Sequence, residues 1–118
     1  MGIEQHQELR KRSKQFALRI IRLSDALPHT RAGNVIGNQV LRSGTAVAAN
    51  YRAVGRARSK AEFIAKMGVV VEEADETVFW LELLNEAGIV PAAKLAPLQK
   101  EANELLSIFS ASRRTARG

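Results

Sequence analysis

Mostly apolar residues in the middle of the chain recur at alternating spacings of four and three residues. They are Phe63, Met67, Val70, Ala74, Thr77, Leu81 and Leu84. This period is close to one α-helical turn, so the seven side chains lie along one side of a helix. Ser59 and Glu62 precede the stripe in the S-x-x-E pattern of a capping box, and Gly88 and Pro91 suit a helix end. We therefore predict a helix over about residues 59–87.

Three other segments carry the same helical pattern, over about residues 4–27, 33–54 and 91–113. Their stripes are Leu9, Phe16, Ile20, Leu23 and Leu27; Ile36, Val40, Val47, Tyr51 and Val54; and Leu95, Leu98, Ala102, Leu105 and Phe109. The connections are too short to cross a bundle, so consecutive helices must be antiparallel neighbours. The pattern predicts an all-α, antiparallel, up-down-up-down four-helix bundle, with one domain over residues 1–118 and a flexible tail at 114–118.

Small residues surround the stripe of the second predicted helix, among them Gly37, Ser43 and Gly44. A glycine inside a helix costs about 1 kcal/mol relative to alanine. Close contact with another helix explains these glycines better than local preference does.

The residue types and motifs that many enzymes require are missing. There is no cysteine, and His6 and His29 are too far apart in sequence for the usual spacing of a shared metal site. The phosphate-loop, dinucleotide-binding, zinc-protease and G-x-S-x-G motifs are also missing. We therefore predict that the protein is not an enzyme and has no catalytic residues, no cofactor and no metal site.

Cellular location is predicted from what the sequence lacks. No apolar run approaches the roughly 20 residues of a membrane-spanning helix. The first residues are polar, without the apolar centre of a signal peptide. With no cysteine to form disulfides, a cytoplasmic protein without a membrane partner is expected.

Positive charge is concentrated in the first half of the chain. Residues 1–60 hold 12 Lys and Arg against 3 Asp and Glu, whereas residues 61–106 hold 3 against 9. The net charge of +6 favours a polyanionic partner, because each neutralised phosphate releases condensed counterions. The candidate nucleic-acid-binding residues are Arg10, Lys11, Arg12, Lys14, Arg19 and Arg22 in the first helix, and Arg52, Arg56, Arg58 and Lys60, which cluster at one end of the bundle. The alternative is a solubilising charged face.

Two further groups have alternative interpretations. The first is a polar network of Arg42, Asn50, Glu62, Lys66, Glu73 and Glu76. These residues form either a solvated face with ordinary salt bridges or a partly buried cluster, inside the bundle or between subunits. The second group is Phe79 and Trp80, which either complete the monomer core or form an oligomer interface, where aromatic residues are enriched.

The sequence elements R-S-G-T at 42–45, A-N-Y-R at 49–52, S-x-x-E-F at 59–63 and E-T-x-x-W-L-E at 76–82 occur in this order. In these elements the chain resembles the four-helix bundle proteins encoded in intervening sequences of bacterial 23S ribosomal RNA genes. The resemblance covers about residues 16–90. One departure is Ala53, where the family's N-Y-R-E-A pattern often has an acidic residue.

The resemblance implies a ring-shaped homopentamer related to the accessory proteins of diversity-generating retroelements, which bind nucleic acid and a reverse transcriptase through a basic surface. It also implies that the polar motif residues maintain the fold or the ring. The leading hypothesis is therefore a non-enzymatic homo-oligomer that contacts RNA or DNA backbones. The alternative is a structural or adaptor protein whose partner is another protein, such as a reverse transcriptase.

Overall fold

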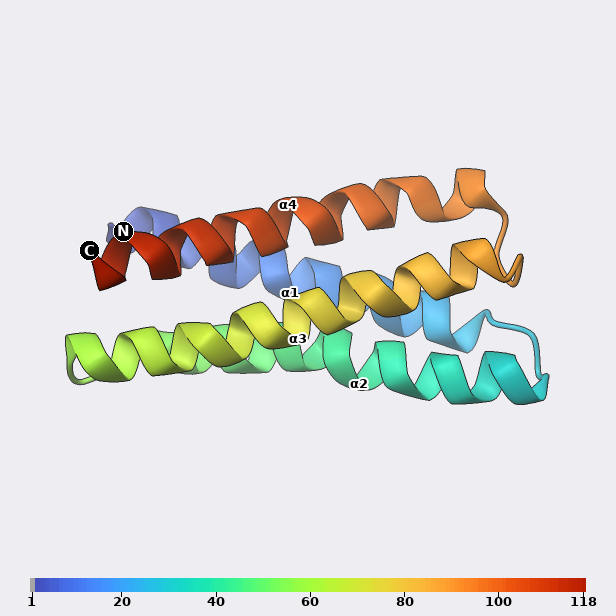
Figure 1. Ribbon diagram of the computed structural model, residues 1–118, viewed down its shortest axis with the longest axis horizontal. Coiled ribbons are helices and arrows are strands. Elements are labelled where there is room, and N and C mark those ends of the chain that lie inside the picture. The colour runs from blue at the N-terminus through green and yellow to red at the C-terminus, as the bar shows by residue number, and fades with distance from the viewer. Residues whose placement is uncertain (1) are drawn as a thin grey trace.

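Four helices account for nearly all of the chain. The computed structural model describes residues 2–118. It contains α1 (Ile3–Asp25), α2 (Arg31–Val54), α3 (Lys60–Glu86) and α4 (Ala92–Arg117), and no strand occurs in the described part. The chain reverses direction at each connection, so successive helices are antiparallel (Figure 1). The predicted up-down-up-down four-helix bundle is confirmed.

The helices begin and end where the sequence signals predicted, to within a few residues. Thr30 accepts a hydrogen bond from the backbone N–H of Gly33, and Ser59 accepts one from the N–H of Glu62, each at 3.0 Å. These N-caps satisfy donors that have no partner within their helices. After α3, Gly88 adopts a positive φ of 68°, a conformation that glycine accommodates without strain.

The predicted apolar stripes meet in one core. Of the stripe residues, only Leu23, Ile36 and Phe63 are half-buried rather than buried, and all three still pack against that core. The bundle measures 45 × 22 × 22 Å, as expected for four long helices side by side. None of the helices in the described part is long and apolar enough to cross a membrane.

Close packing between α1 and α2 explains the small residues of α2. A Cβ atom on Gly37 would lie 3.1 Å from Leu27 Cδ1, and the Ser24 hydroxyl donates a hydrogen bond of 3.1 Å to the Gly37 carbonyl. A Cβ atom on Gly44 would meet the side chain of Ile20. The predicted close approach of another helix at these glycines is confirmed.

The last helix is longer than predicted, because α4 continues to Arg117, through most of the segment 114–118 that was expected to be a flexible tail. Arg113 Nε donates a hydrogen bond of 3.1 Å to the carbonyl of Ile64, which holds the last turns of α4 against α3. Ala116 is partly buried. Arginines are also favourable near the carboxyl end of a helix dipole. The polar composition of the tail carried none of this information.

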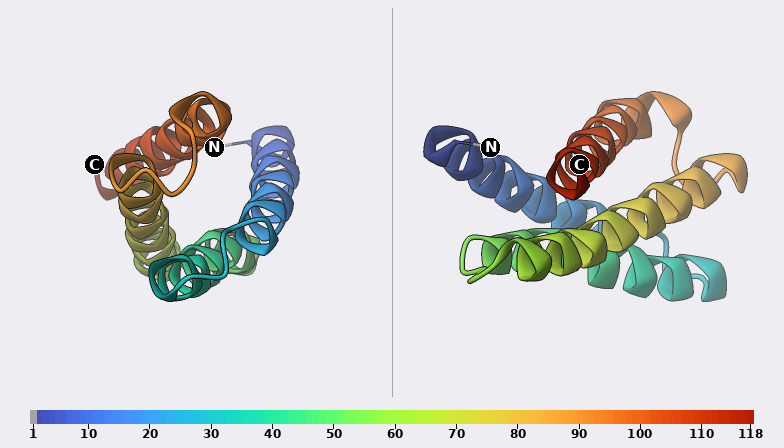
Figure 2. Two further views of the ribbon diagram at one scale, coloured as in Figure 1. Left: turned by 90° about the vertical axis from the view of Figure 1, so that its right-hand side faces the viewer. Right: turned by 60° about the vertical axis from the view of Figure 1, so that its left-hand side comes forward.

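The four helices do not pack equally on all sides. Contacts are extensive between α1 and α2, α2 and α3, and α3 and α4, but α1 and α4 contact each other sparsely. Figure 2 shows the amino-terminal part of α1 diverging from α4. A pocket of about 440 Å³ lies there, lined in part by Gln5, Phe63 and Ile108. The bundle is therefore open along one side, near the two chain ends.

Candidate nucleic-acid interface

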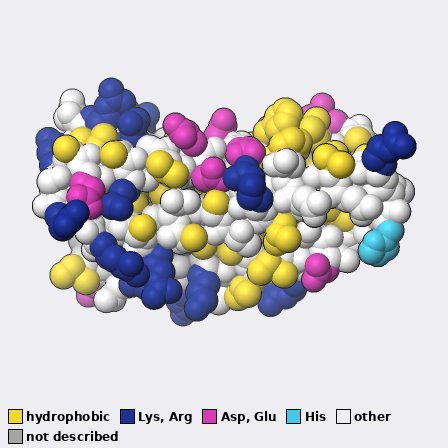
Figure 3. All heavy atoms as spheres, turned by 90° about the horizontal axis from the view of Figure 1, so that it is seen from below, with side chains coloured by type: hydrophobic (Ala, Val, Ile, Leu, Met, Phe, Trp, Pro, Cys, Tyr) yellow, Lys and Arg dark blue, Asp and Glu magenta, His cyan; other side chains and the backbone are white. Residues whose placement is uncertain are grey.

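The fold brings basic residues from distant parts of the sequence to one end of the bundle. The amino terminus, the carboxyl terminus and the connection between α2 and α3 all lie at this end (Figure 1). In the face seen in Figure 3, Lys and Arg side chains gather over the half of the molecule that contains this end. The last turns of α4 add Arg113, Arg114 and Arg117, which are not among the predicted nucleic-acid-binding residues.

Arg10 connects the basic residues of α1 with those of α2. It lines a shallow hollow of about 230 Å³ together with Lys11 and Lys14. It also lines a larger pocket together with Arg52 and Arg56. We call these five residues, Arg10, Lys11, Lys14, Arg52 and Arg56, the basic surface. All five are exposed.

The basic surface carries charge that the protein itself does not neutralise. Within residues 2–118, no carboxylate lies within 4.0 Å of its Lys or Arg nitrogens. The same holds for three other predicted binding residues, Arg19, Arg22 and Lys60. Arg58 lies 3.7 Å from Glu62, but its side chain is 88% exposed and stays accessible to a ligand.

Arg12 differs from the other predicted binding residues because it is held in a partly buried, bidentate ion pair. Its Nε and Nη2 donate hydrogen bonds of 2.8 and 2.6 Å to the carboxylate of Glu101 on α4, and Glu104 lies 3.5 Å from Nη2. The hydrogen bond from Arg12 lowers the pKa of Glu101, with Arg19 adding a weaker electrostatic contribution. Arg12 therefore joins α1 to α4 rather than presenting a free charge.

The predicted polar network divides into separate groups on the outside of the bundle. Arg42 on α2 bonds to Glu73 at 3.1 Å and to Glu76, both on α3. Trp80 Nε1 also donates to Glu76, at 3.2 Å. The hydrogen bond from Arg42 is the main cause that lowers the pKa of Glu76.

The remaining network residues do not join Arg42. Lys66 lies 3.9 Å from Glu62, one turn away on the same helix. Asn50 donates a hydrogen bond of 2.8 Å to the carbonyl of Ala46 within α2. Three acidic residues of α3, Glu62, Glu73 and Glu76, thus pair with Arg42, Arg58 and Lys66, and within residues 2–118 no ion pair involves the basic surface.

Phe79 and Trp80, which the sequence groups together, have different environments. Trp80 is partly buried and packs against the core, and its ring meets that of Phe79 edge-on with centroids 5.0 Å apart. Phe79 remains 48% exposed. Completion of the core therefore accounts for Trp80 but not for Phe79.

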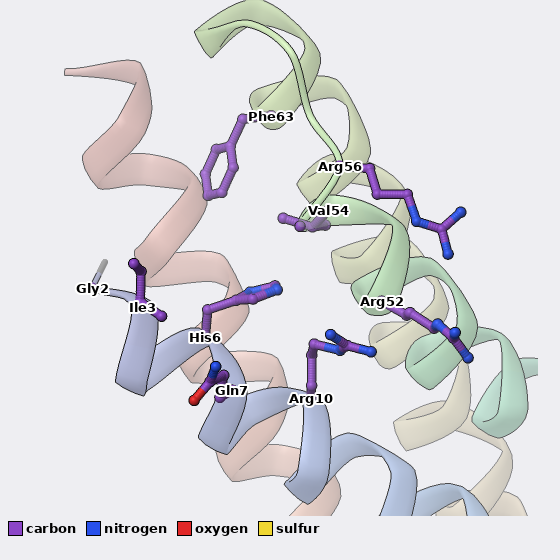
Figure 4. A pocket seen from close by; sticks show the side chains of 10 residues that line it. Gly2, Ile3, His6, Gln7, Arg10, Arg52, Val54, Arg56 and Phe63 are labelled. Carbon is purple, nitrogen blue, oxygen red and sulfur yellow. The ribbon is translucent and has the colours of Figure 1, made fainter.

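The larger pocket, of about 490 Å³, lies between the first turns of α1 and the carboxyl end of α2. His6 extends from α1 across this pocket toward α2 (Figure 4). Its Nδ1 lies 3.0 Å from the hydroxyl of Tyr51, and the Tyr51 ring stacks on Phe109 behind it. Burial, followed by the charge of Arg10, lowers the pKa of His6, and burial raises the pKa of Tyr51 to about 12.

Sequence reasoning missed this pocket because its parts are not neighbours along the chain. His6 and Tyr51 are 45 positions apart, and no single motif contains both. In the described part of the chain, no three His, Cys, Asp or Glu side chains are grouped so that they could hold a metal ion. The pocket is a basic and partly apolar cavity.

Comparison with known proteins identifies the family. The model of the 23S rRNA-intervening sequence protein family matches residues 5–111. The chain belongs to this family. It is also similar to the crystal structure of a protein of unknown function from the S23 ribosomal protein family of Bacteroides thetaiotaomicron, with a TM-score of 0.85 and 30% sequence identity. That similarity covers 92% of this chain and 97% of the other. No curated protein matches the chain.

Two of the elements that carried the resemblance, R-S-G-T and E-T-x-x-W-L-E, consist largely of packing residues of the α2–α3 hairpin. From R-S-G-T, Ser43 and Gly44 are buried, and from E-T-x-x-W-L-E, Thr77 is buried. The hydroxyls of Ser43 and Thr77 lie 2.9 Å apart. The A-N-Y-R element contributes Tyr51 to the core and exposes Arg52. The R-S-G-T and E-T-x-x-W-L-E elements thus describe how the family folds. Most of the basic surface lies outside all four elements.

Proposed function

We propose that this protein is a non-enzymatic nucleic-acid-binding protein that acts as a homo-oligomer and contacts RNA or DNA backbones through the basic surface. The observation that carries the proposal is the unneutralised set Arg10, Lys11, Lys14, Arg52 and Arg56, on α1, α2 and the connection that follows α2. Phosphates on a nucleic-acid backbone would neutralise these side chains and release condensed counterions, which drives such binding.

Contact with the backbone fits the composition of this surface better than recognition of bases. Arginine and lysine bind phosphates without reading sequence, whereas non-specific binding of unpaired bases relies on exposed aromatic rings. The exposed aromatic residue of the described chain is Phe79, which belongs to α3 and lines neither hollow of the basic surface. Binding is therefore expected to depend strongly on salt and weakly on sequence.

Self-association would strengthen such contacts. Phe79 and Val69 are exposed apolar side chains of α3, at 48% and 42%, and they offer a contact for a second copy. The family resemblance leads us to expect a pentamer. Several basic surfaces held together would multiply weak phosphate contacts, because each further contact becomes intramolecular.

The test is fluorescence anisotropy with a short labelled RNA and the matching DNA, over a salt series from about 50 to 200 mM. Lys11→Gln/Lys14→Gln is expected to weaken binding at every salt concentration and to reduce the salt slope. The matched control is Arg31→Gln/Lys94→Gln, which removes the same charge from exposed residues at the opposite end of the bundle.

Three results would overturn the proposal: no binding at the lowest salt, binding that does not change with salt, or equal losses in the two double variants. Equal losses would mean that net charge alone matters. A protein partner that is recovered after nuclease treatment, together with an absence of RNA and DNA binding, would instead support the adaptor function.

A further inference from the structure

We propose that the pocket lined by His6, Arg10, Arg52 and Arg56 binds a phosphomonoester, the terminal phosphate of a nucleic-acid strand. This inference deepens the proposed function and rests on it for the strand that carries the phosphate. The binding of a phosphomonoester in the pocket is a separate claim that small ligands can test.

The first argument is charge in a confined space. Arg10 from α1 and Arg52 and Arg56 from the end of α2 stand on the same side of the opening (Figure 4). No Asp or Glu lines the pocket, and none in the described chain lies within 4.0 Å of these three guanidinium groups. Guanidinium forks match the geometry of phosphate oxygens, and they carry their charge at all physiological pH values. Three such groups along one rim of the pocket favour an anion of more than one charge.

The second argument distinguishes a terminal phosphate from a phosphate within a strand. A phosphomonoester carries about −1.5 to −2 charges at neutral pH, whereas each backbone phosphate carries one. The pocket volume of about 490 Å³ is in the range that holds a nucleotide-sized group. Ile3, Val54 and Phe63 provide an apolar wall beside the arginines, suited to the sugar and base of the last nucleotide.

The third argument is the position of His6. The Tyr51 hydroxyl lies 3.0 Å from Nδ1 of His6 and holds the ring in place. Nε2 faces Gly55, where a Cβ atom would lie only 2.6 Å away, so Gly55 leaves the room that the His6 ring occupies. When the ring is protonated, both of its nitrogens are N–H donors, and His6 can then donate to an anion in the pocket.

Bound phosphate would act on His6 in a measurable direction. In the free protein, burial and Arg10 both lower the pKa of His6. The other groups that line its pocket are the cations Arg52 and Arg56, and Tyr51 lies behind the ring. A dianion beside the ring favours the imidazolium, so it would raise the pKa of His6.

The two histidines make this effect testable by NMR. His6 lies in the pocket, and His29 lies in the α1–α2 connection at the opposite end of the bundle. Adenosine 5′-monophosphate is expected to shift the His6 ring signals and to raise its pKa, while the His29 signals stay in place. Adenosine, which lacks the phosphate, is expected to leave both histidines unchanged.

Three variants locate the binding in the pocket. Arg52→Gln/Arg56→Gln is expected to abolish the His6 response, and Lys11→Gln/Lys14→Gln, which lies outside the pocket, is expected to keep it. Gly55→Ala tests the pocket without changing its charge, because the added Cβ would displace the His6 ring. The backbone φ of Gly55, −62°, suits alanine. For each variant, circular dichroism is the control that checks whether the helices are retained.

Oligonucleotides with and without a terminal phosphate complete the test. The phosphorylated strand is expected to bind about tenfold more tightly, and this preference should vanish in Arg52→Gln/Arg56→Gln. Two results would contradict phosphomonoester binding in the pocket: equal affinity for both strands, or a response to the nucleotide that is the same at His6 and His29. Either result would leave the proposed backbone binding intact. If His6 responds specifically to the nucleotide but neither strand binds, the phosphomonoester site is supported and the proposed function is contradicted.

Discussion

Arg12 and Glu101 join α1 to α4 through two parallel hydrogen bonds of 2.8 and 2.6 Å. These are the adjacent helices with the sparsest contact. The Glu101 side chain is only 17% exposed, so the pair is shielded from water more than an ordinary surface salt bridge. The bidentate geometry adds orientation as well as energy. One ion pair therefore closes a side of the bundle that apolar packing leaves weak.

Glu101→Gln is expected to lower the free energy of unfolding by about 1 kcal/mol at neutral pH. Arg12 lowers the pKa of Glu101 below its ordinary value of 4.5 in the folded state. The stabilisation is therefore fully present above pH 4.5 and is lost as the pH falls through the folded pKa. Urea unfolding at neutral and strongly acidic pH measures this difference. Glu72→Gln, an exposed α3 carboxylate, is the control, and a cost of Glu101→Gln that persists in acid would contradict the assignment.

Gly44→Ala is expected to destabilise the protein by about 1–3 kcal/mol, although alanine favours helix. Its Cβ would lie 2.8 Å from two carbons of the branched Ile20 side chain, which is fully buried and has no free space to move into. Gly68→Ala is the milder comparison, because its Cβ would lie 3.1 Å from Nε of Arg113, and this side chain can shift at the cost of its hydrogen bond to Ile64. Thermal unfolding should show a larger fall in the midpoint for Gly44→Ala than for Gly68→Ala. The reverse order would mean that α1 and α2 do not pack as described.

Thr77→Val is expected to cost about 1–2 kcal/mol, because it keeps the shape of the side chain but removes a buried hydrogen-bond partner. The hydroxyls of Ser43 and Thr77 lie 2.9 Å apart, and both residues are fully buried. Ser43 also donates to the carbonyl of Val40 at 3.4 Å, so Ser43→Ala in the Thr77→Val background should cost less than Ser43→Ala alone, because the bond between the two hydroxyls is already absent. A double-mutant cycle by chemical denaturation measures the coupling, and additive losses would show that the two hydroxyls do not interact.

Phe79→Ser is expected to shift the protein toward smaller assemblies in light scattering, while the monomer fold is retained because the ring is half exposed. Val35→Ser, at an exposed position of α2, is the control for a general loss of surface apolarity. If the unmodified protein is itself a monomer in solution, or if both variants change its mass equally, Phe79 is not part of a specific contact.

The helices could be predicted from the sequence because their signals are local. A stripe such as Met67, Val70 and Ala74 requires only the period of the helix, and Ser59 caps the helix that it precedes. The family elements likewise describe neighbours within one hairpin. The core and the chain direction followed from these local patterns and from the shortness of the connections.

The availability of each charge was decided by the tertiary structure. Arg10 and Arg12 are two residues apart in a basic run, yet one lines an open pocket and the other is paired with Glu101. The same applies to His6, which meets Tyr51, and to Arg113, which holds the last turns of α4 against Ile64. The period of a helix determines which side chains share a face. The distances between side chains on different helices depend on how the four helices pack, and this packing is set only when the whole chain folds.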